Sequence, residues 1–126
     1  EIAQCLVGSE MCIRDSLIPY WDFNAPEIPN EPRDASAATC IASALYELST
    51  YVPEYKALYK EEADRILENL TAHYRAKPNG DNGFLLLHST GSKPHNSEID
   101  VPIVYADYYF LEALIRKNKL EKEQKL

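Results

Sequence analysis

The chain has 126 residues, enough for one domain with a modest core or for a piece of a larger one. Its 20 acidic residues outnumber its 13 basic residues, so general binding of nucleic acid through phosphate neutralisation is not expected. No run of about 18 apolar residues predicts a membrane span, and the visible N-terminus does not read as a signal peptide. We therefore expect neither nucleic acid nor a membrane as a partner, and the compartment, cytoplasm or periplasm, stays open.

The cysteines are Cys5, Cys12 and Cys40, an odd set without a CxxC pair or matching histidine spacing. Neither a zinc site nor a disulfide framework is predicted from this set, and we expect no metal and no cofactor. Cys40 lies in a run of small residues with helical character, which favours a buried free thiol.

A loop and a helix are expected at the start of the main sequence. Four prolines between Pro19 and Pro32 exclude a regular helix there and favour an ordered, extended connection. Asp34 is a plausible N-cap for a helix over 35–51, because its carboxylate can accept from free amides two or three residues on. Residues expected on the buried face are Ile41, Leu45 and Leu48.

Two further helices are expected, separated by a long loop. A helical pattern of apolar residues follows Pro53 and continues to Lys77. A brief extended segment, "GFLLLH", then enters the loop "HSTGSKPHNSEID". Asp100 and Pro102 fit the N-cap and first turn of a third helix. That helix is apolar on nearly every side up to Arg116, and we expect a solvated or frayed charged end beyond it.

Three helices with such apolar faces make an awkward complete domain, because the third needs more cover than the first two supply. The residues alone therefore indicate an all-α piece whose missing neighbours precede it. Early turns of the first helix are rich in Ala and Ser, which predicts close packing of another backbone against them.

Three separated stretches carry a resemblance to a known family. In order, "PYWDFNAPEIPNEPRDASAA", "LLLHSTGSKPHNSEIDVP" and "YADYYFLEALIR" resemble the C-terminal part of glycoside hydrolase family 88, the unsaturated glucuronyl hydrolases. The similarity runs from Leu17 to about Arg116. It implies the C-terminal hairpins of a truncated six-hairpin (α/α) barrel, in which the first and third helices are inner and the second is outer.

The resemblance also implies a reaction. Family members remove a 4,5-unsaturated uronic acid from oligosaccharides that polysaccharide lyases produce. An aspartic acid protonates C4 of the vinyl ether, water adds at C5, and the resulting hemiketal opens. The catalytic aspartates lie in the earlier parts of family members, so we expect no catalytic residue in this chain and no activity from it alone. The implied partner is an unsaturated uronyl oligosaccharide derived from a glycosaminoglycan.

Candidate substrate-binding residues lie in the two loops. His88, Ser89, Ser92 and Lys93 bring a titratable ring, hydroxyls and an ammonium to one turn, which suits a carboxylate or sulfate. In the family this loop lies at the mouth of the pocket and helps to recognise the sugar and its sulfate groups. Trp21 can stack on a sugar ring or anchor the core.

Several other side chains are assigned structural roles. Asp22 is expected to fix its own loop, and Asp107 to be paired structurally, with substrate contact as the less favoured alternative. Arg33 is open to either an anion or a neighbouring residue. Aromatic residues of the third helix that we expect mostly in the core are Tyr105, Tyr108 and Tyr109.

Two alternative functions stay open. One is an unsaturated rhamnogalacturonyl hydrolase, which shares the barrel and the hydration chemistry. The other is a non-catalytic helical module that binds carbohydrate or a partner. The specific oligosaccharide, the tolerance of sulfate and the oligomeric state are not predicted.

The stretch "LVGSEMCIRDS" at 6–16 matches neither helical nor strand periodicity. It resembles one reading frame of a transposon-type sequencing adapter. We therefore expect 1–16 to be an artefactual leader, and 17–126 to be part of the hydrolase domain with a charged tail from about 117.

Overall fold

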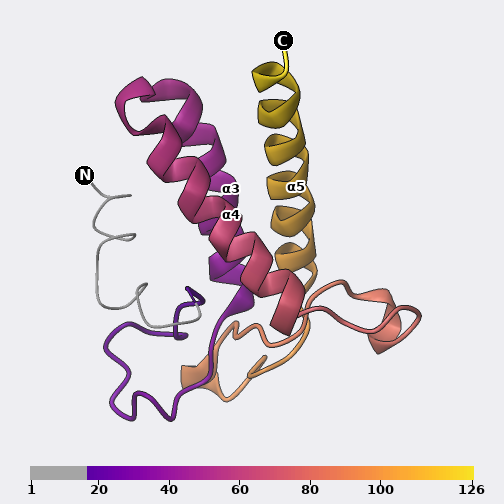
Figure 1. The fold of residues 1–126 in the computed structure, drawn as a ribbon. Helices are drawn as coiled ribbons and strands as arrows, with labels where there is room; N and C mark the ends of the chain where they lie inside the picture. The colour runs from indigo at the N-terminus through magenta and orange to yellow at the C-terminus, as the bar shows by residue number, and fades with distance from the viewer. Residues whose placement is uncertain (1–16) are drawn as a thin grey trace.

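The computed structural model describes residues 17–126, apart from the side chain of Asp81. Its body consists of α3 (Ala35–Tyr51), α4 (Lys56–His73) and α5 (Val104–Gln124), as Figure 1 shows. Short 3-10 turns are η1 (Pro53–Tyr55), η2 (Asp81–Gly83) and η3 (Lys93–His95). No β-strand forms within 17–126, where pairing is limited to isolated bridges, so the all-α expectation is confirmed. The expected leader, 1–16, lies outside the described residues.

Helix α3 begins and ends where the sequence predicts. Asp34 has an extended backbone, and its Oδ1 accepts a hydrogen bond from the amide of Ser36 at 3.0 Å. This bond satisfies one of the free amides of the first turn. The helix ends at Tyr51, since Val52 precedes Pro53 and is therefore disfavoured from helical geometry.

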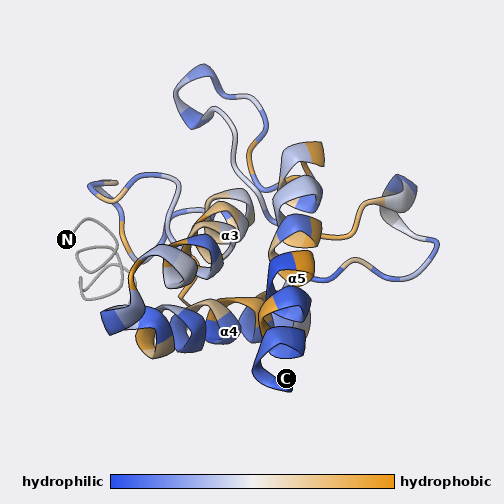
Figure 2. Ribbon diagram, turned by 90° about the horizontal axis from the view of Figure 1, so that it is seen from above, coloured by the Kyte–Doolittle hydropathy of each residue, from blue (hydrophilic) through white to orange (hydrophobic). Residues whose placement is uncertain are grey.

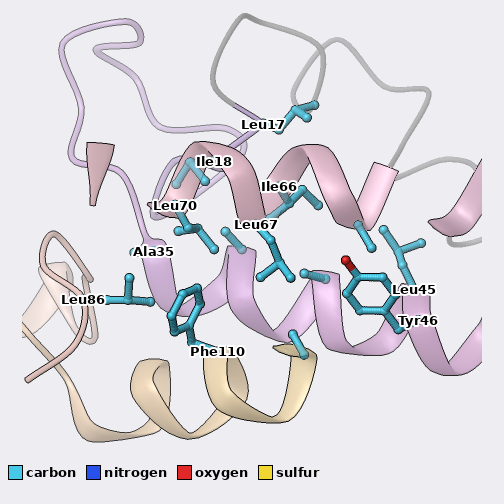
Figure 3. Close-up of a cluster of buried hydrophobic side chains, with 14 of the residues drawn as sticks. Leu17, Ile18, Ala35, Leu45, Tyr46, Ile66, Leu67, Leu70, Leu86 and Phe110 are labelled. Atoms are coloured by element: carbon cyan, nitrogen blue, oxygen red, sulfur yellow. The ribbon is translucent and has the colours of Figure 1, made fainter. Parts of the chain in front are cut away.

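Helix α3 packs against both α4 and α5 and so forms the centre of the core. Its Ala35, Ala38 and Ala42 are fully buried, as the small-residue pattern predicts. Figure 3 shows Leu45 and Tyr46 of α3 in the same cluster as residues of α4, and Phe110 of α5 beside it. Leu45 is buried, whereas Ile41 and Leu48 are partly buried against the cluster. Small side chains therefore bring the three backbones close together.

Helix α4 ends at His73, so the prediction of a helix to Lys77 is wrong. Tyr74 caps the helix, and the chain then turns to pair with the segment that follows. Arg75 and Leu86 form an isolated antiparallel bridge, and the amide of Ala76 donates to the carbonyl of Leu85 at 2.9 Å. Lys77 precedes a proline, which disfavours helical geometry at that residue.

Helix α5 begins at Val104, so the prediction of Asp100 as its N-cap is wrong. Ile103 occupies the cap position without a side-chain hydrogen bond, and Pro102 lies before the helix. Asp100 instead has a left-handed backbone with φ of 54°, and its carboxylate lies beside His88. The carboxylate of Asp100, which we expected to cap α5, therefore forms a contact within the loop instead.

The charged end of α5 is helical as far as Gln124 and most of its side chains are exposed, so of the two expectations the end is solvated and not frayed. Leu120 is buried, and the ammonium of Lys117 lies 3.0 Å from Oδ1 of Asp64 on α4. Figure 2 shows these C-terminal turns as mainly hydrophilic. One buried leucine and one ion pair attach a largely polar segment to the body.

Helix α5 also has an apolar face that nothing in 17–126 covers. Tyr105 and Tyr108, expected in the core, are 43% and 61% exposed, while Tyr109 is half-buried. Further exposed apolar residues on α5 are Val104, Leu111, Leu114 and Ile115.

On α3, Cys40 is exposed, which contradicts the buried thiol that we expected. None of the helices in the described part of the chain is long and apolar enough to cross a membrane.

Polar contacts join the helices beside the core. Tyr46 on α3 donates to Oδ1 of Asp64 on α4 at 2.6 Å, and burial raises the pKa of Tyr46. Desolvation raises the pKa of Asp64, but hydrogen bonds from Lys60, Tyr46 and Lys117 outweigh it, and the pKa lies below its ordinary value. Asp64 is therefore held as a carboxylate that ties α4 to both other helices.

Candidate substrate-binding site

Two long loops meet at one end of the helices, one before α3 and one before α5 (Figure 1). The amide of Ala35 donates to the carbonyl of His88 at 3.1 Å. Thr90 donates twice, from its amide to Oδ1 of Asp34 at 3.2 Å and from its hydroxyl to the carbonyl of Arg33 at 3.1 Å. Asp34 therefore caps α3 and also holds the second loop against the first.

The loops bring Trp21 and Lys93 together around Glu31. Nε1 of Trp21 donates to Oε2 of Glu31 at 2.7 Å, and the ammonium of Lys93 forms a short hydrogen bond to the same oxygen. The amide of Glu27 donates to Oε1 of Glu31 at 3.2 Å. The ammonium of Lys93 also lies 5.3 Å from the centre of the indole ring. Two predicted site residues thus share one carboxylate.

Glu31 is a functional candidate that the sequence reasoning missed. Its side chain is only 1% exposed, although a charged residue normally faces solvent. Hydrogen bonds from Lys93 and then from Trp21 hold the pKa of Glu31 below its ordinary value. In the sequence, Glu31 stands among prolines in the run "PNEPRD", but its cationic partner lies far away in the loop before α5. No local pattern therefore indicates the ion pair.

His88 lines a separate cleft of about 410 Å³ in the same region. Its Nδ1 lies 2.7 Å from Oδ1 of Asp100, and its ring meets that of Tyr74 edge-on at 5.8 Å. Burial raises the pKa of Tyr74, which the charge of Arg33 partly opposes. The lining residues are Pro32, Arg33, His73, Tyr74, His88 and Asp100. The cleft offers an imidazole and a phenol to a polar ligand.

The two serines of the candidate set lie in different surroundings. Ser89 is fully buried and its backbone pairs with Val101, with both hydrogen bonds at 2.9 Å. Its hydroxyl has no hydrogen-bond partner among residues 17–126. Ser92 is half-buried, and its hydroxyl lies 2.7 Å from Nδ1 of His95. In this arrangement Ser92 is accessible to a ligand and Ser89 is not.

Asp22 and Arg33 also have structural partners. Oδ1 of Asp22 accepts from the amide of Asn24 at 2.8 Å, so this aspartate fixes its own loop, as expected. The guanidinium of Arg33 donates to the carbonyl of Ile18 at 2.6 Å and stacks 3.8 Å from the ring centre of Tyr20. These contacts keep Arg33 against its own loop.

Asp107 accepts from two backbone amides of the segment between α4 and α5. Its Oδ2 lies 2.9 Å from the amide of Leu85, and its Oδ1 lies 3.1 Å from that of Leu86. The expected structural pairing is therefore present. Within 17–126, no group of three or more acidic, histidine or cysteine side chains is placed to hold a metal ion.

Comparison with known proteins gives this geometry its context. No family model matches the chain. It is 53% identical over 104 residues to an unsaturated glucuronyl hydrolase of Formosa agariphila, covering 82% of this chain and 26% of that protein. The chain is homologous to unsaturated glucuronyl hydrolases. An unsaturated chondroitin disaccharide hydrolase of Streptococcus pneumoniae is 31% identical over 105 residues, covering 81% of this chain and 26% of that protein.

Solved unsaturated glucuronyl hydrolases share the fold. One described as specific for heparin aligns with a TM-score of 0.89 and 44% identity, over 96% of this chain and 32% of that chain. One from Bacillus sp. GL1 aligns with a TM-score of 0.81 and 24% identity, over 91% of this chain and 30% of that chain, which supports the fold alone. The chain spans about a quarter of the length of its curated relatives. The expected piece of an α/α barrel is therefore confirmed.

Proposed function

We propose that this chain supplies substrate-binding loops to an unsaturated glucuronyl hydrolase that acts on unsaturated uronyl oligosaccharides. The observation that carries the proposal is the meeting of Trp21 and Lys93 around Glu31, in two loops distant in sequence, in the same region as the cleft that His88 lines. The 53% identity to the Formosa agariphila enzyme supports the same activity. A related streptococcal hydrolase has been solved in complex with the sulfated disaccharide dGlcA-GalNAc6S.

The accessible residues suit different parts of such a sugar. The half-buried indole of Trp21 offers an apolar surface on which a sugar ring stacks. Ser92 and His88 supply donors for hydroxyl and carboxylate oxygens, and Lys93 supplies donors for hydroxyl oxygens. Ser89 supports the loop through its backbone pairing with Val101.

The reaction itself uses an aspartic acid outside this chain. That acid protonates C4 of the vinyl ether, water adds its oxygen at C5, and the resulting hemiketal opens to release the remaining sugar. Four aspartates of the described chain have structural partners instead. Asp34 caps α3, Asp22 fixes its loop, Asp107 accepts from two amides, and Asp100 lies beside His88. The chain therefore binds and orients substrate and performs no proton transfer of its own.

The proposal is tested by separating binding from chemistry. The chain alone is expected to leave the absorbance of the double bond in dGlcA-GalNAc unchanged. A chimera, in which the aligned part of this chain replaces the matching segment of the Formosa agariphila enzyme, is expected to consume that double bond. Circular dichroism of the chimera, and the unaltered Formosa enzyme as a positive control, show whether the exchange preserves folding.

The outcomes separate the alternatives. Hydrolysis by the chain alone contradicts the proposal that the catalytic acid lies elsewhere. A folded chimera that is inactive on glucuronyl disaccharides but active on an unsaturated rhamnogalacturonyl disaccharide favours that related activity. A folded chimera without either activity, combined with sugar binding by the chain alone, favours a non-catalytic binding module.

A further inference from the structure

Glu31 occupies an unusual position for a residue beside a sugar-binding loop. Its carboxylate is buried between two side chains that we assign to substrate binding, and both of its oxygens are already hydrogen-bonded. The side chain of Lys93 is 31% exposed, whereas that of its partner Glu31 is 1% exposed. The ion pair therefore forms part of the surface that a ligand meets.

We propose that Glu31 is a positioning and specificity residue that cancels the charge of Lys93 beside Trp21, so that this corner accepts sugar hydroxyls and disfavours sulfate. The part of this proposal that concerns sugars rests on the function proposed above. The part that concerns charge rests only on the contacts among the three side chains.

The physical reason is competition for the ammonium. A sulfate that binds Lys93 must displace or share a charge-assisted hydrogen bond with Glu31, and it is repelled by that carboxylate. Displacement also leaves a buried carboxylate without its cation, which is strongly unfavourable. A sugar hydroxyl meets neither cost, because it can accept from another N–H of the ammonium while the ion pair stays intact.

Glu31 also fixes the indole on which we expect the sugar to stack. The bond from Nε1 of Trp21 to Oε2 of Glu31 sets the ring's orientation, and the position of Lys93 near the ring adds a cation–π contact. Oε2 of Glu31 therefore fixes the position of the Trp21 indole relative to the ammonium of Lys93.

Trp21 is the only tryptophan, so its fluorescence reports on this corner without interference. The chain is compared with its Glu31→Gln, Lys93→Met and double variants by quenching with iodide, caesium and neutral acrylamide. Glu31→Gln leaves the ammonium uncompensated, and we expect the ratio of iodide to caesium quenching to rise about twofold at low salt. Lys93→Met is expected to lower that ratio, and the double variant to restore it.

Glu27→Gln is the matched control, because it removes one negative charge from an exposed side chain of the same loop. A general effect of net charge moves this control as far as Glu31→Gln, which contradicts a local role for the buried carboxylate. Acrylamide quenching, insensitive to charge, shows whether a variant merely exposes the indole. If Glu31→Gln does not fold, an unchanged ratio in Lys93→Met alone overturns the proposal.

The sugar preference is measured in the chimera with dGlcA-GalNAc and dGlcA-GalNAc6S. The parent chimera is expected to have the lower KM for the unsulfated disaccharide. Glu31→Gln is expected to lower the KM for the sulfated disaccharide about fivefold relative to the KM for the unsulfated one, which shifts the ratio of the two kcat/KM values toward the sulfated sugar. A role confined to folding lowers activity on both substrates equally and overturns the proposal. If the chimera acts on neither sugar, the proposed function is contradicted, whereas the quenching ratios still decide the charge role of Glu31.

Discussion

Two half-buried carboxylates hold the loops by accepting hydrogen bonds from backbone amides. Asp34 accepts from Ser36 in its own helix and from Thr90 in the distant loop. Asp107 accepts from Leu85 and Leu86 with its two oxygens. Each of these bonds satisfies a backbone amide that no helix or strand pairs, so the two aspartates supply acceptors where regular secondary structure does not.

Replacing Asp107 by Ala is expected to lower the free energy of unfolding by about 2 to 3 kcal/mol, since two amides lose a charged acceptor. Asp107→Asn, which keeps one acceptor oxygen, is expected to lose about half of that. Urea unfolding followed by circular dichroism measures both. Glu123→Ala, at an exposed site on the same helix, is the matched control, and an equal loss in that variant contradicts the role of Asp107.

The distance between partners decides which of these roles a sequence can reveal. The cap formed by Asp34 was predictable because its acceptor and donor lie two residues apart. It was predictable that Asp107 has hydrogen-bond partners, because a carboxylate within an apolar helix requires them. The identity of those partners was not predictable, since they lie in the segment before the helix. The contact between Glu31 and Lys93 spans 62 residues, and no local pattern encodes it.

At the scale of elements, the same rule explains which helix ends were predicted. Helix α3 has its start and stop signals adjacent to it, in Asp34 and Pro53, and both ends were correct. The start of α5 was wrong because Asp100 contacts His88 instead of capping the helix. Of the two expectations for its end, solvated or frayed, the frayed one was wrong, because charge was taken as a sign of fraying although Leu120 is buried in the common core.

Leu120 is therefore expected to stabilise the last turns of α5 in spite of their charge. Leu120→Ala is expected to lower the free energy of unfolding by about 2 to 3 kcal/mol, through lost burial and a cavity beside the core. Leu114→Ala on the same helix, where the side chain is 38% exposed, is expected to cost less than half as much. Equal losses from the two substitutions in urea unfolding contradict the docking of this segment.

At the scale of the molecule, the apolar face of α5 is the feature that sets this chain apart from a self-sufficient domain. Tyr108, Leu111 and Ile115 are exposed and line a shallow, mainly apolar hollow. Contiguous exposed apolar surface of this kind marks a contact with further protein. The relatives are about four times as long as the part that aligns, and additional helices in such a protein would have this face available.

The chain by itself is therefore expected to self-associate through α5. Its formal net charge of −7 opposes that association, so the fraction of dimers and larger species should rise with salt as the repulsion is screened. Sedimentation velocity of the chain at several salt concentrations measures it.

Leu111→Lys combined with Ile115→Lys is expected to return the chain to a monomer, because the two charges must be desolvated in any contact. Glu54→Gln combined with Glu61→Gln is the matched control, since both side chains are exposed away from the apolar hollow and the pair changes the net charge by the same two units. A chain that stays monomeric at high salt, or a control that dissociates as fully as the α5 variant, contradicts association through this face.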